Sequence, residues 1–98
     1  MAIESSGNYS YVGEHTITVG SVIANSSKTV TTTVPSFIDT PHVPHVIANT
    51  LTDTGLGIGN AWFTVSNLVT TLNIKILNST VGNVTPTNDP IVFKVVVL

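Results

Sequence analysis

Residues 91–98, Ile-Val-Phe-Lys-Val-Val-Val-Leu (IVFKVVVL), decide the fold class of this chain. Alternate residues of a β-strand point to opposite faces of its sheet, and here both faces are apolar except at Lys94. Valine, isoleucine and phenylalanine are strong strand formers. A strand of this content at an exposed sheet edge would be an aggregation hazard. We therefore expect a strand that is central in its sheet or covered by a neighbouring subunit.

The same period of two recurs along the rest of the chain, and no segment shows helical periodicity. Residues 28–34 place valines on one face and threonines on the other, and residues 68–78 alternate in the same way. A change of phase at Gly20 indicates a bend or bulge. The predicted strands are residues 14–24, 28–34, 43–51 or 45–51, 61–66, 68–78 and 91–98.

The connections between these strands are rich in turn-forming residues. Asn25-Ser26-Ser27 predicts a hairpin turn between the first two strands. Three prolines within residues 35–44 exclude a central strand and predict a rigid, extended connection. Residues 52–60 (TDTGLGIGN), with three alternate glycines, predict a loop, and residues 79–90 are turn-rich.

Six to seven short strands, with turn signals about every 8–15 residues, predict an all-β fold. We expect a small antiparallel β-sandwich or a jelly-roll-like barrel. The 98 residues suffice for one domain with one two-layer core. We assign residues 1–12 to an N-terminal arm, which has few core-forming residues, and residues 13–98 to a single β-sandwich domain. The chain has no cysteine, so neither a disulfide nor a thiolate metal site adds stability.

The charge content is low for a folded domain. Only 8% of the residues are charged, against about 25% in an ordinary domain, and the net charge is -2. This balance gives no basic surface for nucleic acid, and the lack of arginine argues against anionic ligands. No apolar run approaches the roughly 18 residues of a membrane helix. A neutral surface of Thr, Ser and Asn is typical of tight protein contacts, whose centres are poor in charge.

Residues with catalytic or metal-binding chemistry occur, but not in patterns that predict a site. His42 and His45 follow Asp39 and could supply metal ligands around a threefold axis. Residues three apart on an extended chain point to opposite sides, so two loop histidines are the simpler interpretation. The glycines of residues 52–60 lack the spacing of a phosphate-binding loop. Because no nucleophile-elbow motif is present, we expect neither an enzyme nor a cofactor.

The aromatic residues are candidates for an interaction surface. Trp62 and Phe63 are neighbours in a predicted strand, so one faces the core and the other is available to a partner. The available ring could be a platform for a sugar or an anchor between subunits, and we expect a core or interface role. The candidate interaction residues are Ile3, Tyr9, Tyr11, Phe37 and Trp62.

A short, cysteine-free and charge-poor chain rich in Thr, Val and Asn resembles the capsid decoration (cement) proteins of tailed bacteriophages. The resemblance covers composition and layout over the full chain. It implies a β-rich homotrimer on the capsid surface of the virion. Such a protein binds the major capsid protein at the junctions between hexamers and stabilises the assembled shell. Under this resemblance, Met1–Tyr11 is the expected clamp.

A second resemblance concerns the order of three segments: residues 34–53 (VPSFIDTPHVPHVIANTLTD), residues 61–67 (AWFTVSN) and residues 91–98. Their order is similar to that in H-type lectin domains and related phage fibre tips, which are also trimeric β-sandwiches. This resemblance implies an alternative function, a receptor- or carbohydrate-binding module at a fibre or tail tip. The closing tryptophan motif of that family is absent here. A small tail adaptor protein is the third candidate.

Overall fold

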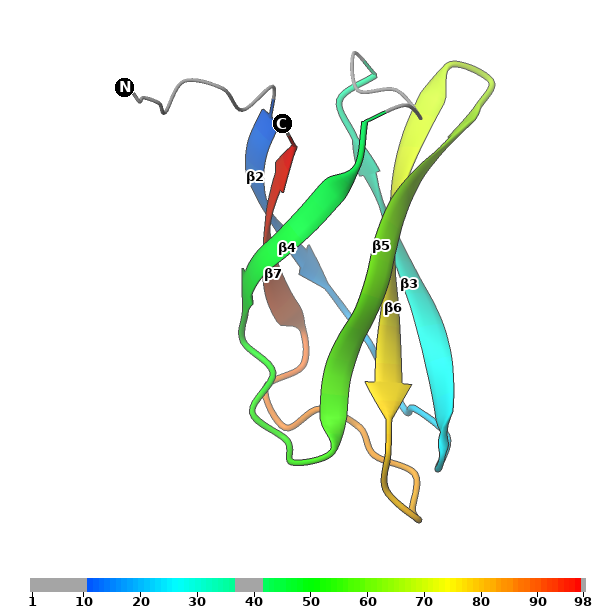
Figure 1. Cartoon of the computed structure of the whole chain (residues 1–98), viewed down its shortest axis with the longest axis vertical. Coiled ribbons are helices and arrows are strands. Elements are labelled where there is room, and N and C mark those ends of the chain that lie inside the picture. Colours follow the sequence, from blue (N-terminus) through cyan, green and yellow to red (C-terminus); the bar gives the residue numbers. More distant parts are fainter. Residues whose placement is uncertain (1–10, 37–41, 98) are drawn as a thin grey trace.

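The computed structural model describes residues 11–36 and 42–97. These residues form two antiparallel three-stranded sheets, in the orders β2-β7-β4 and β3-β6-β5, which pack face to face (Figure 1). The fold is therefore an all-β sandwich, as predicted. The six strands are β2 (Tyr11–Ile17), β3 (Ser26–Val34), β4 (Pro44–Asn49), β5 (Leu56–Ser66), β6 (Val69–Asn78) and β7 (Ile91–Val97).

β7 is the central strand of its sheet, antiparallel to β2 on one side and to β4 on the other. Its inward side chains are fully buried, whereas Lys94 is exposed on the outer face opposite Glu14 of β2. Of the two alternatives predicted from its composition, a central strand or a strand covered by a neighbouring subunit, the structure has the central strand. The inward residues, each 0% exposed, are Ile91, Phe93, Val95 and Val97.

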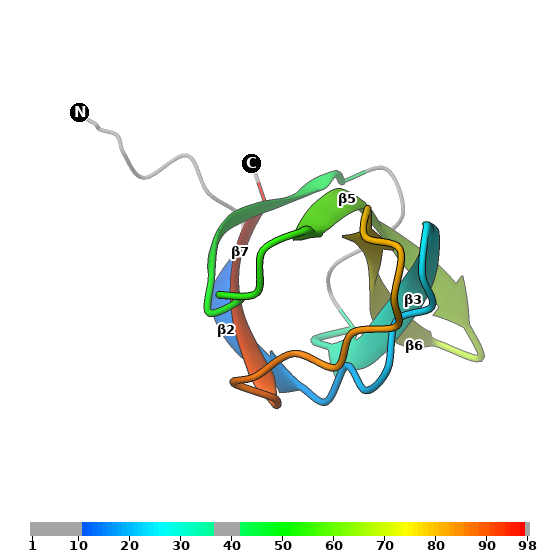
Figure 2. The same cartoon turned by 90° about the horizontal axis from the view of Figure 1, so that it is seen from below.

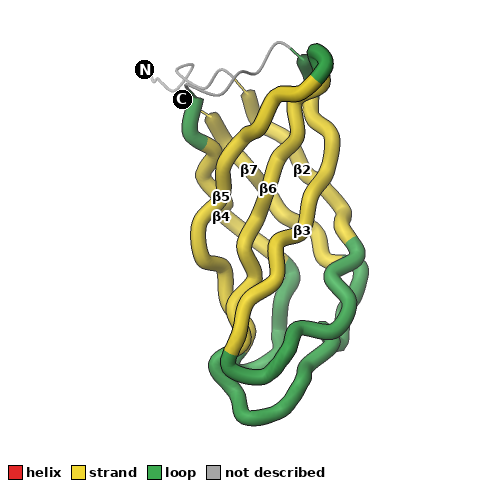
Figure 3. The backbone as a smooth tube through the Cα atoms, turned by 90° about the vertical axis from the view of Figure 1, so that its right-hand side faces the viewer, coloured by secondary structure: helices red, strands yellow, loops and turns green. Residues whose placement is uncertain are grey.

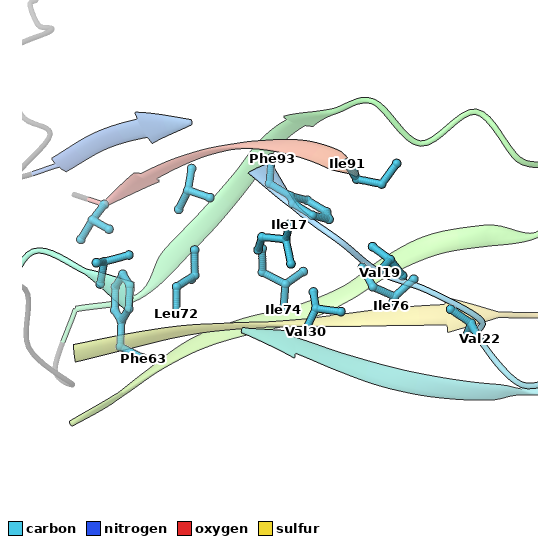
Figure 4. Close-up of a cluster of buried hydrophobic side chains, with 13 residues drawn as sticks. Ile17, Val19, Val22, Val30, Phe63, Leu72, Ile74, Ile76, Ile91 and Phe93 are labelled. Carbon is cyan, nitrogen blue, oxygen red and sulfur yellow. The ribbon is translucent and has the colours of Figure 1, made fainter. Parts of the chain in front are cut away.

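β6 is the central strand of the other sheet and supplies the facing half of the core. Leu72, Ile74 and Ile76 are each 0% exposed and point toward β7, while Phe93 of β7 points back toward β6 (Figure 4). The predicted alternation of this strand is confirmed, because Thr71 and Lys75 lie on its outer side. Val30 and Val34 of β3 and Phe63 of β5 extend the core to the flanking strands.

Successive strands mostly lie in different sheets, and the chain crosses between the layers at their ends (Figure 2). Only β5 and β6 follow each other within one sheet. The hairpin turn predicted at residues 25–27 is therefore wrong, because β2 and β3 belong to opposite layers. Asn25 does adopt a turn conformation, with a φ of 51°, but Ser26 and Ser27 already pair with β6. Turn-forming residues predict that the chain changes direction, but they do not predict which two strands pair.

The strand predicted at residues 14–24 is shorter than expected. It ends at Ile17, and Gly20 takes a positive φ of 73°. The bend predicted at Gly20 is confirmed, but no strand resumes after it. Val22 makes a single bridge to Val84 instead.

The loop predicted at residues 52–60 is wrong for its second half. β5 already begins at Leu56, which pairs with Asn78 at the end of β6. The register shifts between Ile58 and Ala61, so Gly59 and Asn60 form a bulge. Glycine is tolerated here because β5 is an edge strand and the bulge needs no regular pairing.

Buried polar side chains fasten the loops at the end of the sandwich away from the β5–β6 turn (Figure 3). Asn78 is 2% exposed, and its Nδ2 donates to the carbonyls of Val22 and Gly82 at 2.9 and 3.0 Å. The Asp89 carboxylate accepts the backbone N–H groups of residues 19–20 at 2.8 and 3.0 Å. Satisfied networks of this kind fix the loops relative to the strands.

Replacing Ile74 by valine tests the assignment of the core. The change removes one methyl group from a side chain that is 0% exposed and should lower the free energy of unfolding by about 0.5–1.5 kcal/mol. The matched control is Ile23→Val at a side chain that is 65% exposed, where we expect a change below about 0.5 kcal/mol. Urea denaturation followed by Trp62 fluorescence measures both. Equal losses in the two variants would contradict the core assignment.

Candidate protein-binding surface

The outward face of the sheet β3-β6-β5 is rich in neutral polar side chains, and Val69 and Leu77 lie on the same side at the two ends of β6. Alternate residues of a strand share a face, so the residues between the buried ones of these strands point outward together. Antiparallel pairing then aligns them in rows across the three strands. We call this surface the Thr-rich face; it is formed by Thr29, Thr31, Thr33, Trp62, Thr64, Thr71, Asn73 and Lys75.

Asn73 lies in the middle row of the Thr-rich face, between Thr31 of β3 and Trp62 of β5. It is only 8% exposed although it points outward. Its Nδ2 lies 3.2 Å from the Trp62 carbonyl oxygen and 3.2 Å from Thr64 Oγ1. These hydrogen bonds fix β5 against β6 at the surface, so the centre of the face is ordered before any partner arrives.

Trp62 is partly exposed on the Thr-rich face, whereas Phe63 is 5% exposed in the core. The expectation that these neighbours face opposite sides is confirmed. The sequence did not reveal that Asn73 lies beside Trp62. The alternation within residues 68–78 was the available signal, but the contact depends on the register between β5 and β6.

The Thr-rich face carries one ionisable group, Lys75, and otherwise offers hydroxyl groups that both donate and accept hydrogen bonds. Next to the Thr-rich face, the outer surface of β5 has no side chains at Gly57 and Gly59 and is therefore recessed. A Cβ at Gly57 would meet nothing within 4 Å, and the atoms nearest to one at Gly59 belong to the side chains of Lys75 and Leu77. A shallow hollow of about 470 Å³, lined by residues 25–27, Lys75, Leu77 and residues 78–79, adjoins the face.

The two histidines considered as metal ligands lie near β4. His45 is exposed on β4, where it pairs with Val96, and the half-buried His42 precedes the strand. Asp39 lies outside the described residues. Within residues 11–36 and 42–97, no three His, Asp or Glu side chains gather in a group that could hold a metal ion.

Residues 1–10, most of the predicted N-terminal arm, lie outside the described residues. Ile3, Tyr9 and Phe37 all lie outside the described residues. β2 begins inside the segment assigned to the arm, because Tyr11 and Val12 pair with the end of β7. The boundary at residue 12 therefore needs correction, since the last two residues of the expected arm belong to the sheet.

Tyr11 packs along its own strand onto His15. The Tyr11 hydroxyl oxygen lies 2.8 Å from His15 Nε2, and the ring centroids are 5.9 Å apart. A Cβ at Gly13 would meet the Tyr11 ring and hydroxyl, so a larger residue at position 13 would make the Tyr11 side chain shift. Burial lowers the pKa of His15 and raises the pKa of Tyr11, because loss of water disfavours the charged form of each group.

The lowered pKa of His15 makes stability depend on pH. Unfolded histidine titrates near pH 6.5, so the stabilising effect of the neutral ring is fully present above about that pH. It is lost as pH falls through the lower pKa of the folded state. We expect the free energy of unfolding to decrease from about pH 7 to pH 5, with a smaller decrease in His15→Gln. Urea denaturation across this range measures the slope, and His45→Gln, at an exposed position, should retain it. An unaltered slope in His15→Gln would reject this origin.

Comparison with known proteins gives no match: no family model matches the chain, and neither does any curated protein or solved structure. Among the described residues, no helix is long and apolar enough to cross a membrane.

Proposed function

We propose that this β-sandwich is a non-enzymatic structural protein of a phage virion, which binds the assembled capsid shell through the Thr-rich face. The observation that supports the proposal is the composition of that face, which has a partly exposed Trp62, a fixed Asn73 and a single charge. Burying hydroxyl groups against matching partners costs less than burying charges. The proposed partner is the major capsid protein.

The mechanism is mechanical rather than chemical. A protein that binds the assembled shell but not its separated subunits stabilises the shell by mass action. Trp62 anchors the contact by burying its indole, because aromatic side chains near the centre of an interface contribute most of its energy. The surrounding threonines exchange their hydrogen bonds with water for hydrogen bonds with the partner. As the resemblance to decoration proteins implies, the binding unit is a homotrimer.

One observation favours a second candidate, the receptor- or carbohydrate-binding module at a fibre or tail tip. The Trp62 side chain lies on a sheet face among hydroxyl groups, an arrangement that suits stacking on a sugar ring. Copy number separates the candidates. A decoration protein occurs in hundreds of copies over the capsid, whereas a tip module or tail adaptor occurs in a few copies on the tail.

Replacing Trp62 by alanine tests the Thr-rich face as the binding surface. We expect shell binding to weaken at least about tenfold, because truncating a central tryptophan removes an anchor. The matched control is Thr16→Ala, exposed on the opposite sheet. Because the face holds one charge, wild-type affinity should change less than about threefold between roughly 50 and 500 mM salt. Cosedimentation with purified shells measures both. Wild-type shell binding by Trp62→Ala, together with lost glycan binding, favours the carbohydrate-binding module instead.

The clamp function of the arm has a defined test. Because Tyr11 pairs with Val97, the deletion should end at Ser10 and leave β2 intact. If residues 1–10 hold the shell, the truncated chain keeps its thermal transition but no longer cosediments with shells. Circular dichroism checks the fold. Unchanged decoration by the truncated chain removes the arm from the mechanism.

A further inference from the structure

Two surfaces of the described residues are left exposed: a convex apolar tip, and a concave groove whose lining is polar and apolar in about equal parts. The convex surface is the hairpin tip, formed by Val65, Leu68 and Val69 around the β5–β6 turn (Figure 1). The concave surface is the edge groove, formed by residues 43–46 and 58–61 between β4 and β5. Nine large hydrophobic side chains are well exposed, and five belong to the tip or to the β4 segment: Val43, Ile47, Val65, Leu68 and Val69.

The tip presents a leucine where folding alone favours another residue. Asn67 and Leu68 both have positive φ values, 51° and 63°, as in the two-residue turn that prefers Asn-Gly. Leucine is disfavoured in this conformation because its Cβ crowds the following carbonyl oxygen. The side chain is also 88% exposed, so it gains almost nothing from burial within its own chain. Neither backbone preference nor burial among the described residues favours a leucine at this position.

The groove lies between edge strands of the two sheets and has a volume of about 300 Å³. Both strands are bulged there, β4 between Val46 and Ala48, and β5 between Ile58 and Ala61. Bulges keep a strand edge from regular pairing with another strand. The groove beside these bulges is lined by apolar residues such as Val46 and Ile58 and by the polar His45 and Asn60. Val43 at the rim of the groove is 59% exposed.

Neither the tip nor the groove contains a charged residue. No charged residue occurs between Asp53 and Lys75, a stretch that contains the whole tip and the β5 wall of the groove. The absence of Lys and Arg near the tip disfavours an anionic lipid surface as the partner. Ala61 and Leu68 lie far apart along one extended hairpin, so a tip cannot reach the groove of its own chain.

We propose that Leu68 of one copy inserts into the edge groove of a second copy. The contact is head-to-tail, because each copy contributes a tip to one neighbour and a groove to another. Such heterologous contacts close into rings when the rotation permits. The inference rests on the homotrimer of the proposed function and gives it contact residues, but it does not depend on shell binding.

The first test is the association of the full chain, measured by sedimentation equilibrium and native mass. The wild-type chain should associate, and Leu68→Asp should weaken association at least about tenfold, because a buried leucine is replaced by a charge. Aspartate tolerates the left-handed conformation, so the thermal transition should not fall. The matched control is Val81→Asp, at a side chain that is 93% exposed and outside both surfaces, which should associate like wild type.

The second test separates a head-to-tail contact from a symmetric one. Val43→Asp should block the groove and weaken association on its own. A mixture of Leu68→Asp and Val43→Asp chains retains one intact tip and one intact groove, so it should form a heterodimer and stop there. A monomeric wild type at about 100 µM, wild-type association by Leu68→Asp, or a mixture without heterodimer overturns the inference. A chain that associates as expected but does not bind shells rejects only the proposed function.

Discussion

The whole sandwich depends on the burial of β7 against β6. These two central strands contribute seven side chains that are 0% exposed: Leu72, Ile74, Ile76, Ile91, Phe93, Val95 and Val97. Each of the other strands pairs with one of the two. The chain has no cysteine, so no disulfide supplements this contact. Stability of the domain therefore rests on close packing between the two layers.

Placing the apolar content at the centre leaves four edge strands and two outer faces to interact with the surroundings. Charged side chains are too few to cover them, and threonines take their place on the outer face of β3-β6-β5. Asn78 and Asp89 hold the loops at one end of the sandwich through hydrogen bonds to the loop backbone. These hydrogen bonds fix the loops relative to the sheets. A fixed surface loses little conformational entropy on binding, which suits a protein whose proposed task is to hold others together.

The two proposed contacts use different parts of the scaffold. The Thr-rich face lies on strands paired on a regular ladder, whereas the edge groove lies where β4 and β5 depart from regular pairing. Both contacts are nearly free of charge, so they depend on shape and hydrogen bonding rather than on long-range attraction.

The sequence by itself determined the fold class and the inward faces of residues 28–34 and 68–78, whereas for residues 91–98 it left a central strand and a strand covered by a neighbouring subunit as alternatives. Alternation is a local property, so the valines of residues 28–34 and the isoleucines of residues 68–78 assign their own inward side. Only the tertiary structure decided which strands pair. The turn at Asn25 serves a crossover as well as a hairpin, and Gly57 becomes part of a strand only because β6 offers it a partner. The neighbourhood of Asn73 and Trp62 and the exposure of Leu68 follow from that long-range pairing, which local composition does not encode.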